Sequence, residues 1–592
     1  MMGNILRFKT AVALMLLGLL TLLAGIGQKT FWAPPETVTA AAPADATAAP
    51  LTVIDGKLRT QHEGAVTLNV KGEGSFLLAA GRPDDVAAWV GTTAHNTVSG
   101  VSEDGKALQL THADGEASAP SPAGSDLWVT SENASGELKY NWTPPADGDW
   151  TLLLATDGTK PAPTSITMTF PNDTSTPWAV PLMVIGGLLI LAGAALLLLK
   201  PKSGSRARTE AGATADSSAG AGTSGQAAPT TPEARQEPAR EEAGSDKLTA
   251  VARGLRRPGV VLAALTAVAV AGSGVAAQAS QTPAPSPSPS ADAAGQAPAS
   301  PVLIDVQFRR VLEQVASAVD AGDAAKDTGL LGPRVAGSEL EVRTQNYKIR
   351  SQVGTYEARM PVRATKLLTT VVTDKRSWPR TVMAVTQGEG NVVPQLLTLT
   401  QVSPRENYKL VHTTPLQPGT TFPSIARGGT ETLASTDKAE LAYNGEEALG
   451  VLGDRLNSAD SSYKDKLTEG ESSPYIADTL AYQTDVVNSG VNGNFAFTHR
   501  VDPASVVVFR TADGGALALG RLNFTFDGTP KAAGDKLTIG DDAAALAGGR
   551  ETSTGMVLNF AESVAVYIPP AGSSDPLKLV AATRGLVGAS FK

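Results

Sequence analysis

Three long apolar runs interrupt an otherwise mixed pattern of hydrophobic and polar residues. They cover residues 11–26, 178–199 and 260–279. A helix of about 20 mostly apolar residues is long enough to cross the hydrocarbon core of a bilayer. The pattern therefore predicts three transmembrane helices, over residues 10–27, 177–199 and 259–279.

Each run has an alternative interpretation. The first could be a cleavable signal peptide, although it ends in GIGQKTFWAPP, which lacks a clear small-x-small cleavage site. The second could be a buried helix of a soluble domain, but such a helix is rarely apolar on all sides over this length. The third could be an internal export signal that is cut after Ala-Gln-Ala at 277–279. We interpret all three as anchors.

Basic residues beside the three runs predict their orientation. Lys and Arg are enriched on the cytoplasmic flanks of membrane spans, and the flanking cations here are Arg7, Lys9, Lys200, Lys202, Arg253, Arg256 and Arg257. Residues 1–9 and 200–257 are therefore predicted to be cytoplasmic. The expected location is the plasma membrane, with several spans and most of the folded mass extracytoplasmic.

Three segments have the composition of linkers. Residues 28–50 contain the Ala/Pro-rich stretch APPETVTAAAPADATAAP, which is too poor in bulky apolar residues for a core. Residues 200–257 are rich in Ala, Gly, Ser, Thr and Glu, a composition typical of disorder. Residues 280–301 are rich in Pro and predict a stiff stalk.

The segment 51–175 is predicted to be an all-β sandwich. Short runs of β-forming residues alternate with turn-forming residues, as in sandwich domains. The expected strands are 65–70, 75–79, 107–111, 127–130, 138–142, 150–155 and 165–170.

Residues 302–592 show the same order of elements twice. Helical spacing of apolar residues comes first, and strand patterns follow. The first set predicts helices at 303–321 and 338–351, with strands at 367–373, 381–386, 395–402 and 408–413. The second predicts helices at 436–457 and 473–488, with strands at 494–500, 505–511, 516–526, 556–567 and 577–582. This order predicts two α+β NTF2-like (cone) modules, 302–428 and 429–592.

Composition and motifs restrict the possible chemistry. The formal net charge of -9 argues against nucleic acid as a partner, since binding it requires clustered cations. Cysteine is absent, so the chain has no disulfide, thiolate metal site or cysteine nucleophile. No phosphate-binding P-loop, H-E-x-x-H or G-x-S-x-G motif occurs. We therefore predict no catalytic, metal-binding or cofactor-binding residues.

Four residues are speculative candidates for a pocket or a binding surface. His499 and Arg500 end the predicted strand FAFTHR and could line the mouth of a cone, and His412 in KLVHTT has a similar position. Trp378 in KRSWPRT could be an exposed aromatic that stacks on sugar. The alternatives are ordinary edge or surface positions for the first three and a packed hairpin tip for Trp378.

Several stretches resemble uncharacterised multi-span envelope proteins of actinobacteria. They are GRPDDVAAWVG at 81–91, PPADGDWTLLLATDG at 144–158, PWAVPL at 177–182 and DTGLLGPRVAGSELEVRTQNY at 327–347. The resemblance implies a membrane-proximal β-sandwich and tandem NTF2-like outer modules. It implies no activity and no catalytic residues.

Location and domain layout together suggest three functions. The first is a non-enzymatic extracytoplasmic scaffold or interaction protein of the cell envelope, with membrane lipid and another envelope or membrane protein as partners. The second is a binding protein for a small lipid or glycan, which would use an NTF2-like pocket. The third is an enzyme that modifies the cell wall, and its only support is location.

Overall fold

The computed structural model describes residues 2–60, 64–144, 149–199, 301–426, 429–470, 472 and 474–592. The predicted cytoplasmic linker (200–257) and the third predicted span (259–279) lie outside these residues. So does the predicted stalk (280–301), apart from Pro301.

The described chain is rich in β-strand and forms two compact units. Of the described residues, the first unit contains 2–34 and 174–199, and the second contains those of 35–173 and 301–592.

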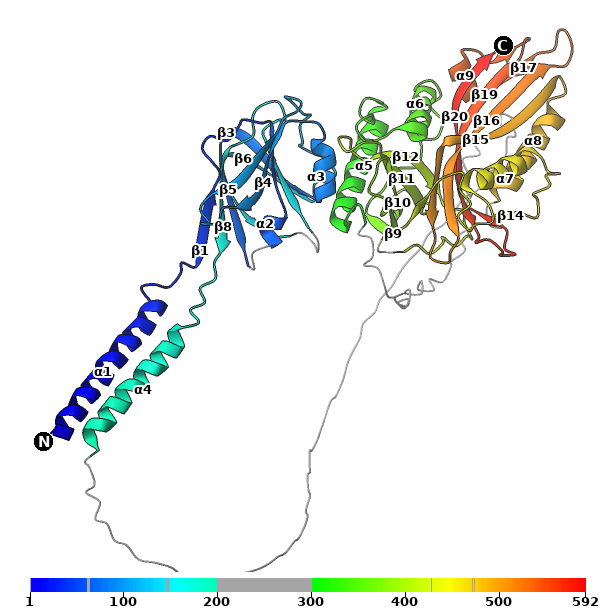
Figure 1. The fold of residues 1–592 in the computed structure, drawn as a ribbon. Coiled ribbons are helices and arrows are strands. Elements are labelled where there is room, and N and C mark those ends of the chain that lie inside the picture. Colours follow the sequence, from blue (N-terminus) through cyan, green and yellow to red (C-terminus); the bar gives the residue numbers. More distant parts are fainter. Residues whose placement is uncertain are drawn as a thin grey trace, which may run out of the picture. The chain divides into compact units, whose positions relative to one another are not determined.

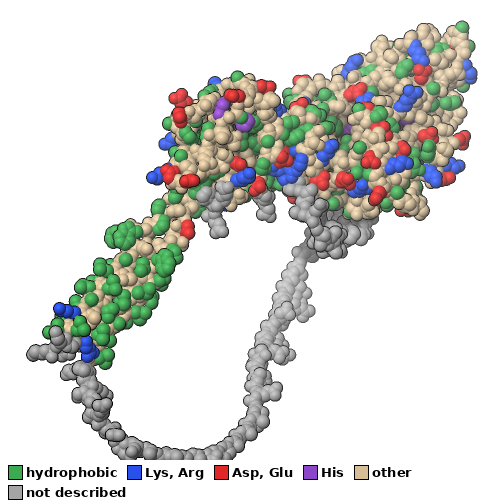
Figure 2. Space-filling model, viewed as in Figure 1, with side chains coloured by type: hydrophobic (Ala, Val, Ile, Leu, Met, Phe, Trp, Pro, Cys, Tyr) green, Lys and Arg blue, Asp and Glu red, His purple; other side chains and the backbone are tan. Residues whose placement is uncertain are grey.

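Two helices, α1 (Met2–Lys29) and α4 (Ala179–Leu198), form the first unit and pack antiparallel along their lengths (Figure 1). Both are long and apolar enough to cross a membrane. The described residues contain two such helices where three are predicted, because the third predicted segment is outside them. Hydrophobic side chains cover the outer surface of the pair (Figure 2).

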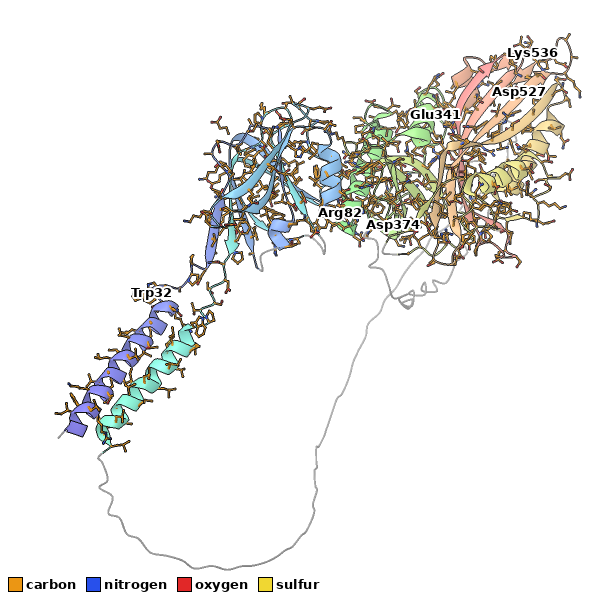
Figure 3. All side chains as sticks on the ribbon, viewed as in Figure 1. Trp32, Arg82, Glu341, Asp374, Asp527 and Lys536 are labelled. Atoms are coloured by element: carbon orange, nitrogen blue, oxygen red, sulfur yellow. The ribbon has the colours of Figure 1, made fainter. Side chains whose placement is uncertain are left out.

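Small residues at every seventh position explain why the two helices approach so closely. The buried positions of the contact are Ala11, Gly18 and Gly25 on α1 and Ala179, Gly186 and Gly193 on α4. A Cβ atom added to Gly186 would lie 2.5 Å from the backbone nitrogen of Leu22. Close backbone packing of this kind is how small residues associate helices in an apolar medium. Beyond α1, the ring of Trp32, which is labelled in Figure 3, lies against Gly27, where an added Cβ would be 2.5 Å from a ring carbon.

The second unit begins with a β domain, residues 35–173. Its elements are β1 (Thr37–Ala41), β2 (Leu51–Ile54), α2 (Lys57–Thr60), β3 (Val66–Gly81), α3 (Pro83–Val90), β4 (His95–Val101), β5 (Leu108–Ala113), β6 (Thr130–Trp142), β7 (Thr151–Ala155) and β8 (Ser165–Pro171). The domain is rich in β-strand, as predicted, and β3 unites two of the predicted strands. The predicted strand 127–130 is wrong except for Thr130, which begins β6. The first strand, β1, lies inside the predicted linker 28–50, because it pairs with β8 and buries Ala40.

The strands of the β domain form one curled sheet rather than the two separate sheets of a sandwich. The order is β1-β8-β3-β7-β2-β4-β5, and β6 pairs with β3. A bulge between Lys71 and Ser75 bends β3, so that its first half pairs with β8 and its second half with β7. Ala41 bridges to Ala107, which nearly closes the sheet around an apolar core.

The remaining described residues, 301–592, form what we call the double-sheet region. Its first module contains α5 (Asp305–Ala325), α6 (Gly337–Gln352), β9 (Lys366–Val372), β10 (Arg380–Gln387), β11 (Gln395–Gln401) and β12 (Lys409–Pro415). The four strands form an antiparallel sheet in the order β12-β11-β10-β9. All six predicted elements of this module are present.

The second module repeats the order of two helices and four long strands. Its elements are β13 (Thr432–Leu433), α7 (Gly445–Asn457), β14 (Leu467–Thr468), α8 (Tyr475–Ser489), β15 (Gly493–Arg510), β16 (Ala516–Pro530), β17 (Leu537–Thr538), α9 (Asp541–Ala547), β18 (Glu551–Thr552), β19 (Met556–Ile568) and β20 (Leu577–Phe591). The sheet order is β13-β15-β16-β19-β20-β14. Strand β15 joins the predicted strands 494–500 and 505–511 across a register shift.

The two modules pack sheet against sheet, which gives layers of helix, sheet, sheet and helix. One face of the first sheet packs on α5 through Val382 and Leu399, among others. Its other face, including Met383 and Val385, packs on the second sheet in a shared apolar cluster. Coverage on both faces explains why β10 is buried at seven consecutive positions.

Polar contacts also join the modules. Glu341 on α6, which is labelled in Figure 3, accepts an ion-paired hydrogen bond from Arg521 on β16, with an Nη1–Oε2 distance of 2.5 Å.

Arginines of the first module hold the β domain against the double-sheet region. Arg380 pairs with Asp85, and Arg334 pairs with Asp126, each at 2.6 Å with nearly buried side chains. Arg405 donates to the carbonyl oxygens of Trp89 and Val90, at 2.8 Å each. Arg310 donates to those of Trp128 and Val129. We call these four arginines and their partners the arginine interface.

Candidate functional site

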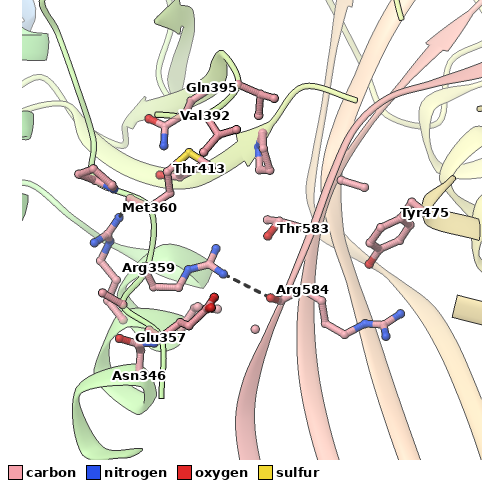
Figure 4. Close-up of a pocket in the computed structure, with 18 of the residues that line it drawn as sticks. Asn346, Glu357, Arg359, Met360, Val392, Gln395, Thr413, Tyr475, Thr583 and Arg584 are labelled. Atoms are coloured by element: carbon pink, nitrogen blue, oxygen red, sulfur yellow. Dashed lines mark hydrogen bonds between the residues drawn. The ribbon is translucent and has the colours of Figure 1, made fainter. Parts of the chain in front are cut away.

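A cavity of about 550 Å³ lies between the two modules of the double-sheet region. Its walls come from α6 and the segment that follows it, from the ends of β11 and β12, and from β20 (Figure 4). The close approach of α6 to β20 depends on Gly585, where an added Cβ would lie 2.5 Å from Val342. The volume is within the range of small-molecule sites.

Most of the cavity wall is apolar. Contributing side chains come from both modules and include Val342, Met360, Val392, Leu416, Phe560 and Leu586. Val392 is 82% exposed, which places it at the rim. A wall of this kind favours an organic body or an alkyl chain over a small polar solute.

Arg343 and Arg584 contact the cavity but are already neutralised. Arg343 is fully buried and donates to Glu339 at 2.7 Å and to both oxygens of Asp323. Burial alone would lower the pKa of Arg343, but these two carboxylates hold it above its ordinary value. Arg584 pairs with Glu562, and its side chain points away from the cavity (Figure 4). These two arginines therefore maintain the structure.

Arg359 differs from the other two cavity arginines. Its half-buried guanidinium donates to the carbonyl oxygen of Arg584 at 3.3 Å, and it makes no ion pair with any described residue (Figure 4). Burial lowers the pKa of Arg359, and Glu339 offsets only part of this effect. A cation without a carboxylate partner inside a cavity is a ready partner for an anionic group.

Polar side chains from β11 and β12 line the wall beside the ends of these strands. Gln395 is fully buried, and neither its amide nitrogen nor its amide oxygen has a partner among the described residues. Thr413 and Gln417 lie on the same side, because Gln395 pairs with Pro415 between them. The hydroxyl of Thr413 and the amide oxygen of Gln417 also lack partners there. Such groups are costly when left without hydrogen bonds.

Two carboxyl groups also contact the cavity. Glu357 is exposed beside Arg359 in the close-up of the site (Figure 4). Asp542, near the start of α9, is 1% exposed, and burial raises its pKa to about 6. The cavity therefore already contains negative charge that opposes a strongly anionic ligand.

The four speculative residues from the sequence do not line this cavity. His412 is buried on β12, and its Nδ1 lies 2.9 Å from Ser563 Oγ. His499 is buried on β15, stacked on Phe524 with ring centroids 4.2 Å apart. Burial lowers the pKa of each histidine to about 4. Arg500 is exposed next to His499.

Trp378 is packed rather than available for stacking on sugar. Its indole nitrogen donates to Gln401 Oε1 at 2.9 Å, and Arg380 lies over its ring. The ring borders the apolar cluster around Trp89 and Trp128 in the β domain. Trp378 therefore contacts both its own module and the β domain.

Sequence reasoning missed the cavity residues because no local pattern marks them. Arg359 stands in the ordinary stretch TYEARMPVR, and its role depends on which other arginines find carboxylates in the fold. Gln395 begins a predicted strand, where a polar residue usually faces solvent. Among the described residues, no group of three or more His, Asp or Glu could hold a metal ion.

Comparisons with known proteins add a family match for the double-sheet region. Residues 299–590 match the model of a family described as a domain of unknown function, DUF8094. No curated protein and no solved structure matches the chain. The matched segment coincides with the double-sheet region, so the part of the chain that resembles this uncharacterised family contains both modules and the cavity between them.

Proposed function

We propose that this protein is a membrane-anchored binding protein of the cell envelope that holds a small ligand between its two modules. The observation that carries the proposal is the cavity, whose mostly apolar wall contains the cation Arg359 and the amide of Gln395, both without side-chain partners among the residues that the structure describes. Convergent polar groups in a mostly apolar pocket are the usual form of a small-molecule site. The role is binding rather than catalysis.

The proposed pocket differs in place from the one expected for an NTF2-like cone. The order of helices followed by an antiparallel sheet supports that fold as a proposal for each module. However, the space between α5 and the first sheet is filled by Phe308, Val311, Tyr347, Tyr408 and their neighbours. The ligand is therefore placed between the modules instead of inside one of them.

The arginine interface supports a three-span topology. If α1 and α4 both cross the bilayer, the β domain between them and the chain after α4 start on opposite sides. The double-sheet region contacts the β domain through buried ion pairs, so both must be on one side. A further crossing between residues 199 and 301 would satisfy this condition, and 259–279 is an apolar segment of suitable length. The positive flanks support an extracytoplasmic location for both folded regions.

The proposed function is tested by identifying the small molecules that copurify with the full chain. The protein would be extracted with its native lipid into polymer nanodiscs, and bound small molecules would be analysed by mass spectrometry. Thr583 faces the cavity (Figure 4), so Thr583→Phe should fill it and remove the bound compound. Thr484→Phe, at an exposed position on α8, is the matched control. Equal content of every compound in wild type and Thr583→Phe would refute the proposal.

The enzyme alternative has one observation in its favour. Asp542, with its raised pKa, and Glu357 contact the same cavity, and two carboxyl groups in different environments can act as acid and base. Release of soluble fragments from cell-wall polymer by wild type, and loss of that release in Asp542→Asn and Glu357→Gln, would favour it. The scaffold role stays a prediction.

A further inference from the structure

The chemistry of the cavity narrows the class of ligand that it can hold, provided that the proposed binding function is correct. The starting point is charge. Arg343 and Arg584 have carboxylate partners, and Arg359 has none within the described part of the chain. One half-buried guanidinium can be satisfied by one anionic group, with a charge-assisted hydrogen bond stronger than a neutral one.

The surrounding carboxyl groups limit that anion to a single charge. Arg343 is paired with two carboxylates, Glu339 and Asp323, so these three groups together are negative by one charge. Glu357 and Asp542 also contact the cavity. A second negative charge on the ligand would therefore meet repulsion without a cation to offset it.

The polar side chains of Gln395 and Gln417 require that the ligand carry a second polar group besides its anionic group. Gln395 offers a donor and an acceptor that find no partner in the described residues, and Gln417 offers such an acceptor. A ligand satisfies them only if it carries a group that can both donate and accept, such as a hydroxyl or an amide. The side chains of Gln395 and Arg359 border the same space in the close-up (Figure 4).

The apolar wall of the cavity indicates that the part of the ligand away from its polar groups is hydrocarbon. Val342, Leu416, Phe560 and Leu586 present hydrocarbon around the polar groups, and the exposed Val392 continues this surface to the rim. We propose that the ligand is an amphiphile with one negative charge, at least one hydroxyl or amide group, and an alkyl body that lies along this wall. Arg359 binds the charge, and Gln395 binds the neutral polar group.

Because the chain contains no cysteine, one introduced cysteine can carry a fluorescent label that reports ligand binding at the cavity. Val392→Cys, labelled with an environment-sensitive fluorophore, would carry the only thiol of the chain at the cavity rim. The full chain in nanodiscs would be titrated with dodecanoate, dodecanol, dodecyl phosphate and dodecyltrimethylammonium, each corrected for partitioning into empty nanodiscs. These probes share one alkyl chain and differ in head group. N-decanoylglycine, which adds an amide to a chain of similar length, tests the role of Gln395.

Among the four dodecyl probes, dodecanoate should bind most tightly, at least about tenfold tighter than dodecanol, because a hydrogen bond to a charged group contributes roughly 1.5–3 kcal/mol. Arg359→Gln should remove this preference, whereas Arg359→Lys should keep part of it. The control Arg500→Gln, which removes an exposed arginine, should leave the preference intact. Gln395→Met should weaken N-decanoylglycine more than dodecanoate.

Three results would overturn the ligand class. They are equal binding of dodecanol and dodecanoate, tighter binding of dodecyl phosphate than of dodecanoate, and an Arg359→Gln variant that keeps the full preference. If no probe binds but Thr583→Phe loses a copurified compound, the ligand class is wrong and the binding function stands. If no probe binds and Thr583→Phe loses nothing, both proposals are wrong.

Discussion

Asp85 and Arg380 are 295 residues apart in the sequence and form an ion pair whose Nη1–Oδ1 distance is 2.6 Å. Both side chains are at most 1% exposed. Asp85 lies on α3 of the β domain, and Arg380 begins β10 of the first module. The pair therefore joins two regions that the sequence separates by an apolar helix and a long linker.

Removing one partner of this pair should destabilise the second unit strongly. Asp85→Ala leaves the guanidinium of Arg380 buried without its carboxylate, which costs about 3–5 kcal/mol. Asp85→Leu combined with Arg380→Met should recover much of the loss, because neither charge remains. Thermal unfolding in nanodiscs of the wild type, Asp85→Ala, the double variant and the control variant measures the effect. Glu137→Ala is the control, since its pair with Lys71 is exposed and should contribute about 0–1 kcal/mol.

The proposed topology predicts the accessibility of single cysteines. Thr159→Cys in the β domain and Ser574→Cys in the second module should both react with a membrane-impermeant maleimide in intact cells. Ser217→Cys, in the predicted cytoplasmic linker, should react only after permeabilisation. Because the native chain has no cysteine, each label reports one position. Reaction of Thr159→Cys and Ser574→Cys from opposite sides would contradict the topology.

Neighbouring glycines on α4 should respond differently to the same substitution. Gly186→Leu places a side chain against the backbone of α1, whereas a Cβ at Gly187 meets nothing within 4 Å. We expect Gly186→Leu to separate the helices and Gly187→Leu to leave them paired. Cross-linking of Met15→Cys to Ile190→Cys with a short thiol reagent, in both backgrounds, provides the measurement, because the native side chains of these residues already lie against Gly193 and Gly18. Equal cross-linking in the two backgrounds would show that the seven-residue spacing does not control the packing.

His412 should make the protein less stable at acidic pH. Burial lowers its folded-state pKa to about 4, so the unfolded chain binds a proton more readily between about pH 6.5 and 4. Stability from this group is therefore complete above its unfolded pKa and is lost as the pH falls towards 4. His412→Gln should flatten the fall in unfolding temperature over this interval. An unchanged slope in the variant would assign the acid sensitivity to other groups.

Local patterns were sufficient for most elements of the double-sheet region. The apolar spacing of Phe308, Val311, Leu312 and Val315 predicts α5, and all four side chains are buried against the first sheet. The strands of the first module lie within one or two residues of their predicted ends. These elements depend on periodicity, which a single sequence displays directly.

Long-range pairing was not predictable in the same way. Strand β1 has the composition of a linker and becomes a strand because β8 supplies hydrogen-bonding partners for it. Residues 51–54 and 95–101 form a parallel pair, β2 and β4, whose short length gives little periodic signal. Arg359 presents the same difficulty for the site: its unpaired state follows from where Glu339, Asp323 and Glu562 lie in three dimensions.

The apolar cluster between the two sheets has a practical consequence for the design of shorter expressed fragments. The repeat in element order suggests a cut between residues 428 and 429, yet Met383 and Val385 on one side and Phe509 and Leu517 on the other form one apolar cluster. Either half expressed alone would present a flat hydrocarbon face to water, a surface prone to aggregation. A soluble fragment should therefore retain both halves.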